Sequence, residues 1–142
     1  MKTIGSSTWA GTWRQGEGTL STQTGIIEDQ YYSYSSRFDG TPGGIPEELL
    51  AAAHAGCFNQ ALANACDKYN FKAESISTEV EIDLGFDDMG RPEVKTYHFK
   101  VSAKVPGATE MEFQDLAALA KASCAISKIL KIETGITATL IA

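Results

Sequence analysis

Hydrophobic and polar residues alternate along several stretches of the chain, a pattern that is typical of half-buried β-strands. Six segments predict strands: residues 6–13, 18–23, 31–38, 75–84, 94–105 and 134–141. The turn-forming residues 87–92 join the fourth segment to the fifth, so these two predict a β-hairpin. The turn residues 39–44 end the first β-rich region.

A long helix is predicted over residues 46–69. It begins with a proline, which suits the first helical position, and Glu47 and Glu48 follow at the positive end of the helix dipole. Residues 49–58 are apolar or small nearly all round, so we expect this helix to be buried on most sides. Gly56 costs about 1 kcal/mol relative to alanine in mid-helix, and close packing is the favoured explanation for it.

Two shorter helices are predicted near the end of the chain. Thr109 and Glu112 fit a capping box ahead of a helix over residues 113–123, and residues 124–131 predict a shorter helical segment. The element order is therefore βββ-α-ββ-α-α-β. This order indicates an α+β fold with a mostly antiparallel sheet, in a single domain over residues 1–142.

The composition restricts the classes of partner. The chain has 142 residues, of which 43% are hydrophobic and 21% charged, as in globular proteins. Its net charge of −6 argues against nucleic acid and anionic membrane as partners, because both attract basic surfaces. No apolar run approaches the roughly 20 residues of a membrane span, and the first residues do not resemble a signal peptide. We therefore expect a cytoplasmic location.

The three cysteines, Cys57, Cys66 and Cys124, do not suit a secreted disulfide scaffold, because their number is odd. Free cysteines are often inert core residues, so neighbouring groups must decide whether any of them is reactive. Cys57 and Cys66 would lie about 13 Å apart on opposite sides of one helix, which excludes a disulfide between them. If Cys57 faces a site, Cys66 packs in the core. Helix packing could bring Cys57 and Cys124 together.

Metal and phosphate sites find little support in the sequence. The turn Gly43-Gly44 lacks the lysine of a phosphate-binding loop. His54, Cys57 and Cys124 could begin a zinc site, but a closed site needs a fourth ligand, either Cys66 or His98. Since Cys66 faces away from Cys57, structural zinc is a minor alternative.

Three stretches resemble the OsmC/Ohr family of osmotically inducible and organic hydroperoxide resistance proteins, and are closer to the OsmC branch. They are residues 37–40 (RFDG), 46–58 (PEELLAAAHAGCF) and 121–130 (KASCAISKIL). The resemblance extends over almost the whole chain. It implies an OsmC-like fold with a long central helix, an intertwined homodimer, and a thiol peroxidase that reduces organic hydroperoxides and, less well, hydrogen peroxide.

The resemblance also implies the roles of four residues. Cys57 matches the peroxidatic cysteine and Cys124 the resolving cysteine, while Arg37 matches the arginine that activates the thiolate and Glu47 its partner. The family works without metal or flavin, and its reductant is usually a dithiol, notably a dihydrolipoyl group on a carrier protein. Ala125 stands where the family usually has proline, which leaves the backbone next to Cys124 more adaptable.

Helix geometry raises a question about Glu47. It would lie about 15 Å from Cys57 along a straight helix, which is far for one arginine to bridge. Either the helix bends or starts late, or Glu47 serves Cys57 of the other subunit. We favour the second hypothesis, because antiparallel packing of two buried helices would bring one chain's helix start beside the middle of the other.

Two other functions are considered. A carrier of small hydrophobic molecules would keep an apolar pocket, but it would need none of the four residues above. A hydrolase could use Cys57 with His54 as base, although a buried histidine with a structural role is favoured. The pocket lining is expected from Phe38, Leu49, Leu50 and Phe58, whereas the N-terminal tryptophans and tyrosines are expected to serve packing.

Overall fold

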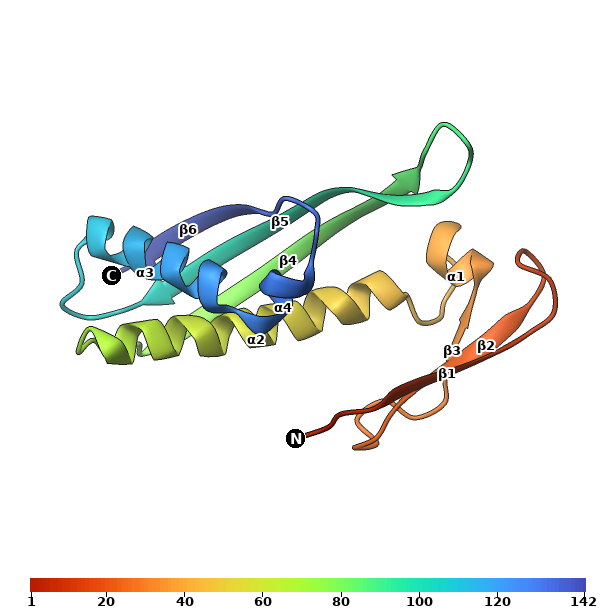
Figure 1. Ribbon diagram of the computed structural model, residues 1–142, viewed down its shortest axis with the longest axis horizontal. Coiled ribbons are helices and arrows are strands. Elements are labelled where there is room, and N and C mark those ends of the chain that lie inside the picture. Colours follow the sequence, from red (N-terminus) through yellow and green to blue (C-terminus); the bar gives the residue numbers. More distant parts are fainter. The chain divides into compact units, whose positions relative to one another are not determined.

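The computed structural model describes residues 1–142 and contains six strands and four helices. Their order is β1 (Gly5–Ala10), β2 (Glu17–Thr22), β3 (Gln30–Ser33), α1 (Tyr34–Phe38), α2 (Pro46–Lys68), β4 (Ser75–Phe86), β5 (Pro92–Lys104), α3 (Glu110–Ser123), α4 (Ala125–Ile129) and β6 (Gly135–Ile141) (Figure 1). The predicted α+β class is confirmed, with α1 as an added helix. The chain divides into two units, residues 1–48 and 49–142.

The first unit is built on a three-stranded antiparallel sheet in the order β1-β2-β3. The prediction of a strand over residues 31–38 was wrong beyond Ser33, where α1 begins. Ser33 caps this helix, since its hydroxyl accepts the backbone N–H of Ser36 while the Ser36 hydroxyl accepts that of Ser33. Such reciprocal capping satisfies two free helix donors, and it outweighs the partial alternation of aromatic and polar residues in this segment.

The second unit contains a three-stranded sheet in the order β4-β5-β6. The predicted hairpin is confirmed: β4 and β5 are antiparallel from the pair Ser75–Lys104 to the pair Phe86–Pro92. β6 runs parallel to β5, so this sheet is mixed, while antiparallel pairing still predominates in the chain.

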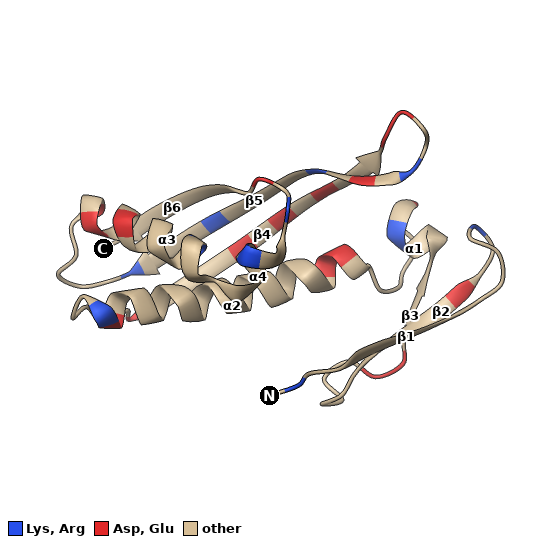
Figure 2. Cartoon of the chain, in the orientation of Figure 1, with Lys and Arg blue, Asp and Glu red and all other residues tan.

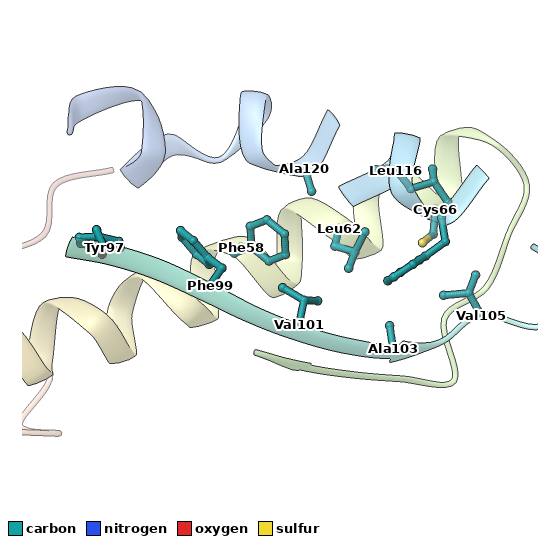
Figure 3. Packing of buried hydrophobic residues seen from close by; sticks show 12 residues of the cluster. Phe58, Leu62, Cys66, Tyr97, Phe99, Val101, Ala103, Val105, Leu116 and Ala120 are labelled. Carbon is teal, nitrogen blue, oxygen red and sulfur yellow. The ribbon is translucent and has the colours of Figure 1, made fainter. Parts of the chain in front are cut away.

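The core of the second unit lies between this sheet and helices α2 and α3 (Figure 3). Buried and more exposed side chains alternate along β5, and its buried face carries Tyr97, Phe99, Val101 and Ala103. Phe58 and Leu62 from α2 and Leu116 and Ala120 from α3 pack against this face. Burial of each large side chain contributes roughly 1.5–3 kcal/mol, so these contacts fix the position of α2 on the sheet.

Helix α2 confirms the predicted long helix, but one chain buries only one of its faces. His54, Phe58 and Leu62 are buried, whereas Ala52, Ala53 and Gly56 are exposed. A Cβ at Gly56 would meet no atom within 4 Å, so close packing at this glycine is not found within one chain. Figure 2 shows that α2 has charged residues only near its two ends. Its exposed middle is therefore uncharged and lined by small residues.

Helices α3 and α4 meet at Cys124, which is the C-cap residue of the first and the N-cap residue of the second. The capping box of Thr109 and Glu112 is confirmed, and it places the first helical residue at Glu110, three residues before the predicted start. No helix in the chain combines the length and the apolar character that a membrane crossing requires.

Candidate active site

Two thiols meet in the second unit. Cys57 is half-buried in the middle of α2, and Cys124 is 1% exposed at the junction of α3 and α4. Their sulfur atoms share a hydrogen bond of 3.1 Å. Both cysteines are free, and this distance exceeds the roughly 2.05 Å of a covalent disulfide. The chain thus holds a reduced pair of thiols in direct contact.

The surroundings of Cys124 favour its thiolate. Burial alone would raise the pKa of this thiol, but the backbone N–H and hydroxyl of Ser127, the thiol of Cys57 and the backbone N–H of Ile126 bring the pKa below its ordinary value. Ala125 is the first residue of α4, where a backbone N–H has no partner inside the helix. Proline, which has no backbone N–H, and alanine therefore both fit this position without loss of a helical hydrogen bond.

Cys66 does not take part in the thiol pair. It is fully buried in the core, as the helical geometry predicts, and burial raises the pKa of its thiol, with a further increase from Asp67. A buried neutral thiol is a poor nucleophile, because the thiolate is the reactive form. Cys66 therefore has the properties of a packing residue.

Arg37 and Glu47 form an ion pair within the first unit. The Arg37 Nε donates to both carboxylate oxygens of Glu47, at 3.1 and 3.0 Å, and its Nη2 donates to Oε1 as well. The Arg37 guanidinium also lies 4.9 Å from the ring centre of Phe38. With two nitrogens engaged, the guanidinium is held in one orientation, and its remaining N–H groups are available to a ligand.

The loop between α1 and α2 sets up this ion pair. The Ser36 hydroxyl donates to the carbonyl of Gly44 at 2.9 Å, and the Gly44 N–H donates to the carbonyl of Tyr31 at 2.7 Å. Gly43 has φ +154°, and a Cβ there would lie 2.7 Å from the Ser36 Cβ. The Gly43-Gly44 turn thus packs against α1, and it leads directly into the helical turn that carries Glu47.

An aromatic hollow of about 300 Å³ lies beside Arg37 in the first unit. Its walls include Trp9, Trp13, Tyr32, Tyr34 and Phe38. Phe38 is in a pocket wall as expected, whereas the tryptophans and tyrosines were expected to serve packing. The hollow has no local signal in the sequence, because Tyr34 and Phe38 reach it from α1. Phe58, expected in a pocket wall, is instead fully buried in the core, where its ring lies 5.1 Å from that of Phe99.

His54 is fully buried on α2, one turn before Cys57. Its Nδ1 lies 2.6 Å from the Tyr97 hydroxyl and its Nε2 lies 2.8 Å from the Ser127 hydroxyl. Both ring nitrogens are therefore occupied by groups other than Cys57, which does not suit a Cys–His hydrolase. His98 on β5 forms a hydrogen bond with the hydroxyl of Thr137 on β6. No three histidine, cysteine or acidic side chains of the chain lie close enough together to hold a zinc ion.

A family model and a curated relative both match most of the chain. Residues 39–139 match the family model described as OsmC-like protein. The chain is 37% identical to Peroxiredoxin OsmC of Escherichia coli strain K12 over 129 residues, which cover 91% of this chain and 90% of that protein.

Solved structures resemble the fold at lower sequence identity. The organic hydroperoxide resistance protein OhrB of Bacillus subtilis superposes with a TM-score of 0.72 at 21% identity, over 97% of this chain and 98% of that one. An OsmC-like protein from Mycoplasma pneumoniae gives 0.76 at 10% identity, over 100% and 99%. These two likenesses concern the fold alone.

Proposed function

Since the chain belongs to the OsmC-like protein family, we propose that it is a thiol peroxidase that reduces organic hydroperoxides to alcohols, and hydrogen peroxide less well. The observation that carries this proposal is the 3.1 Å contact between the free thiols of Cys57 and Cys124. The relative from Escherichia coli, named a peroxiredoxin, supports the same chemistry.

In the first step, the Cys57 thiolate attacks the terminal oxygen of the hydroperoxide. A sulfur–oxygen bond forms, the oxygen–oxygen bond breaks, and the alkoxide leaves and takes up a proton to become the alcohol. Cys57 is thereby oxidised to a sulfenic acid. Its half-buried position supports this role, because a peroxide can reach the sulfur while the site stays largely dry.

In the second step, the Cys124 thiolate attacks the Cys57 sulfenic acid. A disulfide forms, and hydroxide leaves with the proton lost by Cys124, as water. An external dithiol then reduces the disulfide by thiol exchange, which restores both thiols. A dihydrolipoyl group on a carrier protein is the proposed reductant, and the cycle needs no metal or flavin.

Arg37 and Glu47 would act on the first step. In general, an arginine next to a thiol lowers the pKa of that thiol and can donate to the peroxide oxygens. The hydrogen bonds that Arg37 donates to Glu47 support an orienting role for this carboxylate, since it fixes the guanidinium but also partly cancels its charge. The aromatic hollow beside Arg37 supports a preference for hydroperoxides with an apolar group.

The proposal includes a homodimer. The exposed, uncharged stripe of Ala52, Ala53 and Gly56 on α2 is suited to close helix packing against a second copy. In such a dimer, Glu47 of one chain would serve Cys57 of the other. Mixing Glu47→Ala chains with Cys57→Ser chains tests this sharing: recovered activity in mixed dimers supports it, and absence of recovery contradicts it.

The whole proposal is tested by consumption of cumene hydroperoxide with dihydrolipoamide as reductant. We expect turnover by the wild type and loss of turnover in Cys57→Ser. Equal and slow consumption by both proteins would reject the peroxidase and leave the carrier of hydrophobic molecules as the alternative. In that case, fatty acid binding followed by tryptophan fluorescence would test the carrier.

A further inference from the structure

A groove of about 590 Å³ runs along α3, α4 and the segment that leads into β6. Part of its lining is apolar and comes from Ala118, Ala122, Ile132 and Ile136. Ile129, the last residue of α4, adds a large apolar side chain that is 75% exposed. Apolar surface that is open to water and bordered by charged residues is typical of an interaction site.

The charged residues around this groove are mainly basic. Residues 116–142 contain Lys121, Lys128 and Lys131 but only one acidic residue, Glu133, although the whole chain has 18 acidic and 12 basic residues. Lys121, Lys128 and Glu133 line the groove, and Lys131 lies in the segment after α4. Figure 2 shows basic residues on α4 and on that segment. We call this surface, with its three lysines, the basic groove.

The lysines of the basic groove are available to carboxylates from outside the chain. By contrast, glutamates of the same chain form ion pairs with the sheet residues Lys95, Lys100 and Lys104. No ion pair within the chain involves Lys121, Lys128 or Lys131. The Lys121 ammonium is held in place by the carbonyl of Thr134, while Lys128 and Lys131 are exposed. A partner's carboxylate therefore has no internal ion pair to displace.

The basic groove lies close to the thiol pair. The backbone N–H of Lys128 donates to the carbonyl of Cys124 at 3.2 Å, so these two residues are one helical turn apart. One turn rises only about 5.4 Å along a helix axis. A molecule bound at Lys128 is therefore within a short reach of a disulfide between Cys57 and Cys124.

We propose that the basic groove is the docking site for the protein that reduces this disulfide, and that the partner presents an acidic surface beside its dithiol arm. This inference rests on the proposed peroxidase function. The long-range charge of the chain supports it, because a net charge of −6 repels an acidic partner from most of the surface. Attraction to one basic surface then orients the partner and raises the rate of association.

Docking would place the dithiol arm next to the more exposed sulfur of the pair. Cys57 is half-buried, whereas Cys124 is 1% exposed. One thiolate of the arm forms a bond with the sulfur of Cys57, the bond between Cys57 and Cys124 breaks, and Cys124 leaves as a thiolate that takes up a proton. The second thiolate of the arm then displaces Cys57, which is protonated in turn. The arm is oxidised to a disulfide, and both cysteines are again thiols.

The first test compares two synthetic peptides that carry one reduced lipoyl-lysine, flanked by glutamates in one peptide and by serines in the other. The disulfide of the protein is formed beforehand with diamide, so the test needs no peroxidase activity. At low ionic strength, the glutamate peptide should reduce the wild-type disulfide about tenfold faster than the serine peptide. Salt at about 0.5 M should remove most of this difference, because it screens charges. Intact-mass spectrometry after an acid quench gives both rates.

Two double variants locate the effect on the surface. Lys128→Glu combined with Lys131→Glu should lower the ratio of the two peptide rates from about ten to about one. Lys68→Glu combined with Lys72→Glu is the matched control, since it changes the net charge equally through two exposed lysines that form no ion pair. This control should keep most of the wild-type ratio. An equal loss in both double variants would overturn the proposal.

The second test measures binding without redox chemistry. A fluorescein-labelled glutamate peptide with octanoyl-lysine in place of lipoyl-lysine has no sulfur, and fluorescence anisotropy gives its affinity. It should bind the wild type at least tenfold more tightly than the Lys128→Glu, Lys131→Glu variant. Equal affinities would overturn the docking site and leave the peroxidase intact. If the wild type binds as expected but does not consume cumene hydroperoxide, the peroxidase is rejected and the basic groove remains a site for an acidic partner.

Discussion

The sulfur atoms of Cys57 and Cys124 lie 3.1 Å apart, although 67 positions separate the two residues in the sequence. Packing of α2 and α3 on one sheet brings the middle of the first helix next to the end of the second. Formation of a disulfide from this state needs an approach of only about 1 Å. The contact allows a disulfide to be made and broken without a large change of fold.

Oxidation by an organic hydroperoxide should join these two thiols. One equivalent of cumene hydroperoxide should lower the intact mass by two hydrogens per chain, because Cys57 is oxidised and Cys124 then condenses with it. In Cys124→Ser the disulfide cannot form, and the sulfenic acid at Cys57 should persist and react with dimedone. Intact-mass spectrometry measures both products.

Cys66→Ala is the matched control for this experiment. Cys66 is fully buried, so its removal should leave the mass change intact, at a cost in stability. Loss of the disulfide in Cys66→Ala, or its formation in Cys124→Ser, would contradict the pairing of Cys57 with Cys124.

Arg37→Gln should slow the oxidation of Cys57 by tenfold or more. A free thiol has only a few per cent thiolate near neutrality, and the variant would lose the cation proposed to raise that fraction. Stopped-flow measurement of sulfenic acid formation gives the rate. Arg14→Gln is the control, because Arg14 lies over the rings of Trp13 and Tyr34 in the same unit without an ion pair to Glu47. Equal rates in the two variants would reject a special role for Arg37.

Ser36→Ala should lower the free energy of unfolding by about 1–2 kcal/mol. The variant loses one half of the α1 capping box together with the hydrogen bond to the Gly44 carbonyl, inside a buried position. Chemical denaturation measures the change. Ser35→Ala is the control, since the Ser35 side chain takes no part in the cap, and a loss of the same size there would argue against the cap as the cause.

The large elements were predictable because each has a local signal. Alternating apolar and polar residues predicted β4 and β5. A run of small and apolar residues predicted α2. The capping box at Thr109 marked the start of α3, although the predicted first helical residue, 113, lies three residues after the observed one, Glu110. Helical geometry also predicted that Cys66 and Cys57 lie on opposite sides of α2, because nine residues correspond to two and a half helical turns.

The parts that could not be predicted depend on contacts between distant segments. The alternation of Tyr31 to Phe38 concealed α1, since its start is decided by two serine side chains and their backbone. The environment of His54 needs the register of β5 and the position of α4, neither of which has a local signal. Tyr97 gave one usable hint: it lies on the buried face of an alternating strand, where a hydroxyl requires a partner.

His54 should make the protein less stable in mild acid. Burial lowers its pKa in the folded state, so below the ordinary value of about 6.5 the unfolded chain binds a proton that the folded chain does not. The contribution of the neutral ring is therefore complete above that pH and is lost as the pH falls. Chemical denaturation at fixed protein concentration should show a decrease of up to about 1.4 kcal/mol per pH unit between pH 6.5 and pH 5.

His54→Gln should remove most of this decrease, because glutamine does not titrate in that range. His98→Gln is the matched control: His98 lies on the other face of β5, where it bonds Thr137, and its removal should leave the acid dependence in place. The chosen pH range stays above that in which carboxylates such as Asp87 and Glu112, with lowered pKa values, take up protons. A His54→Gln protein that loses stability as steeply as the wild type would show that another group titrates on unfolding.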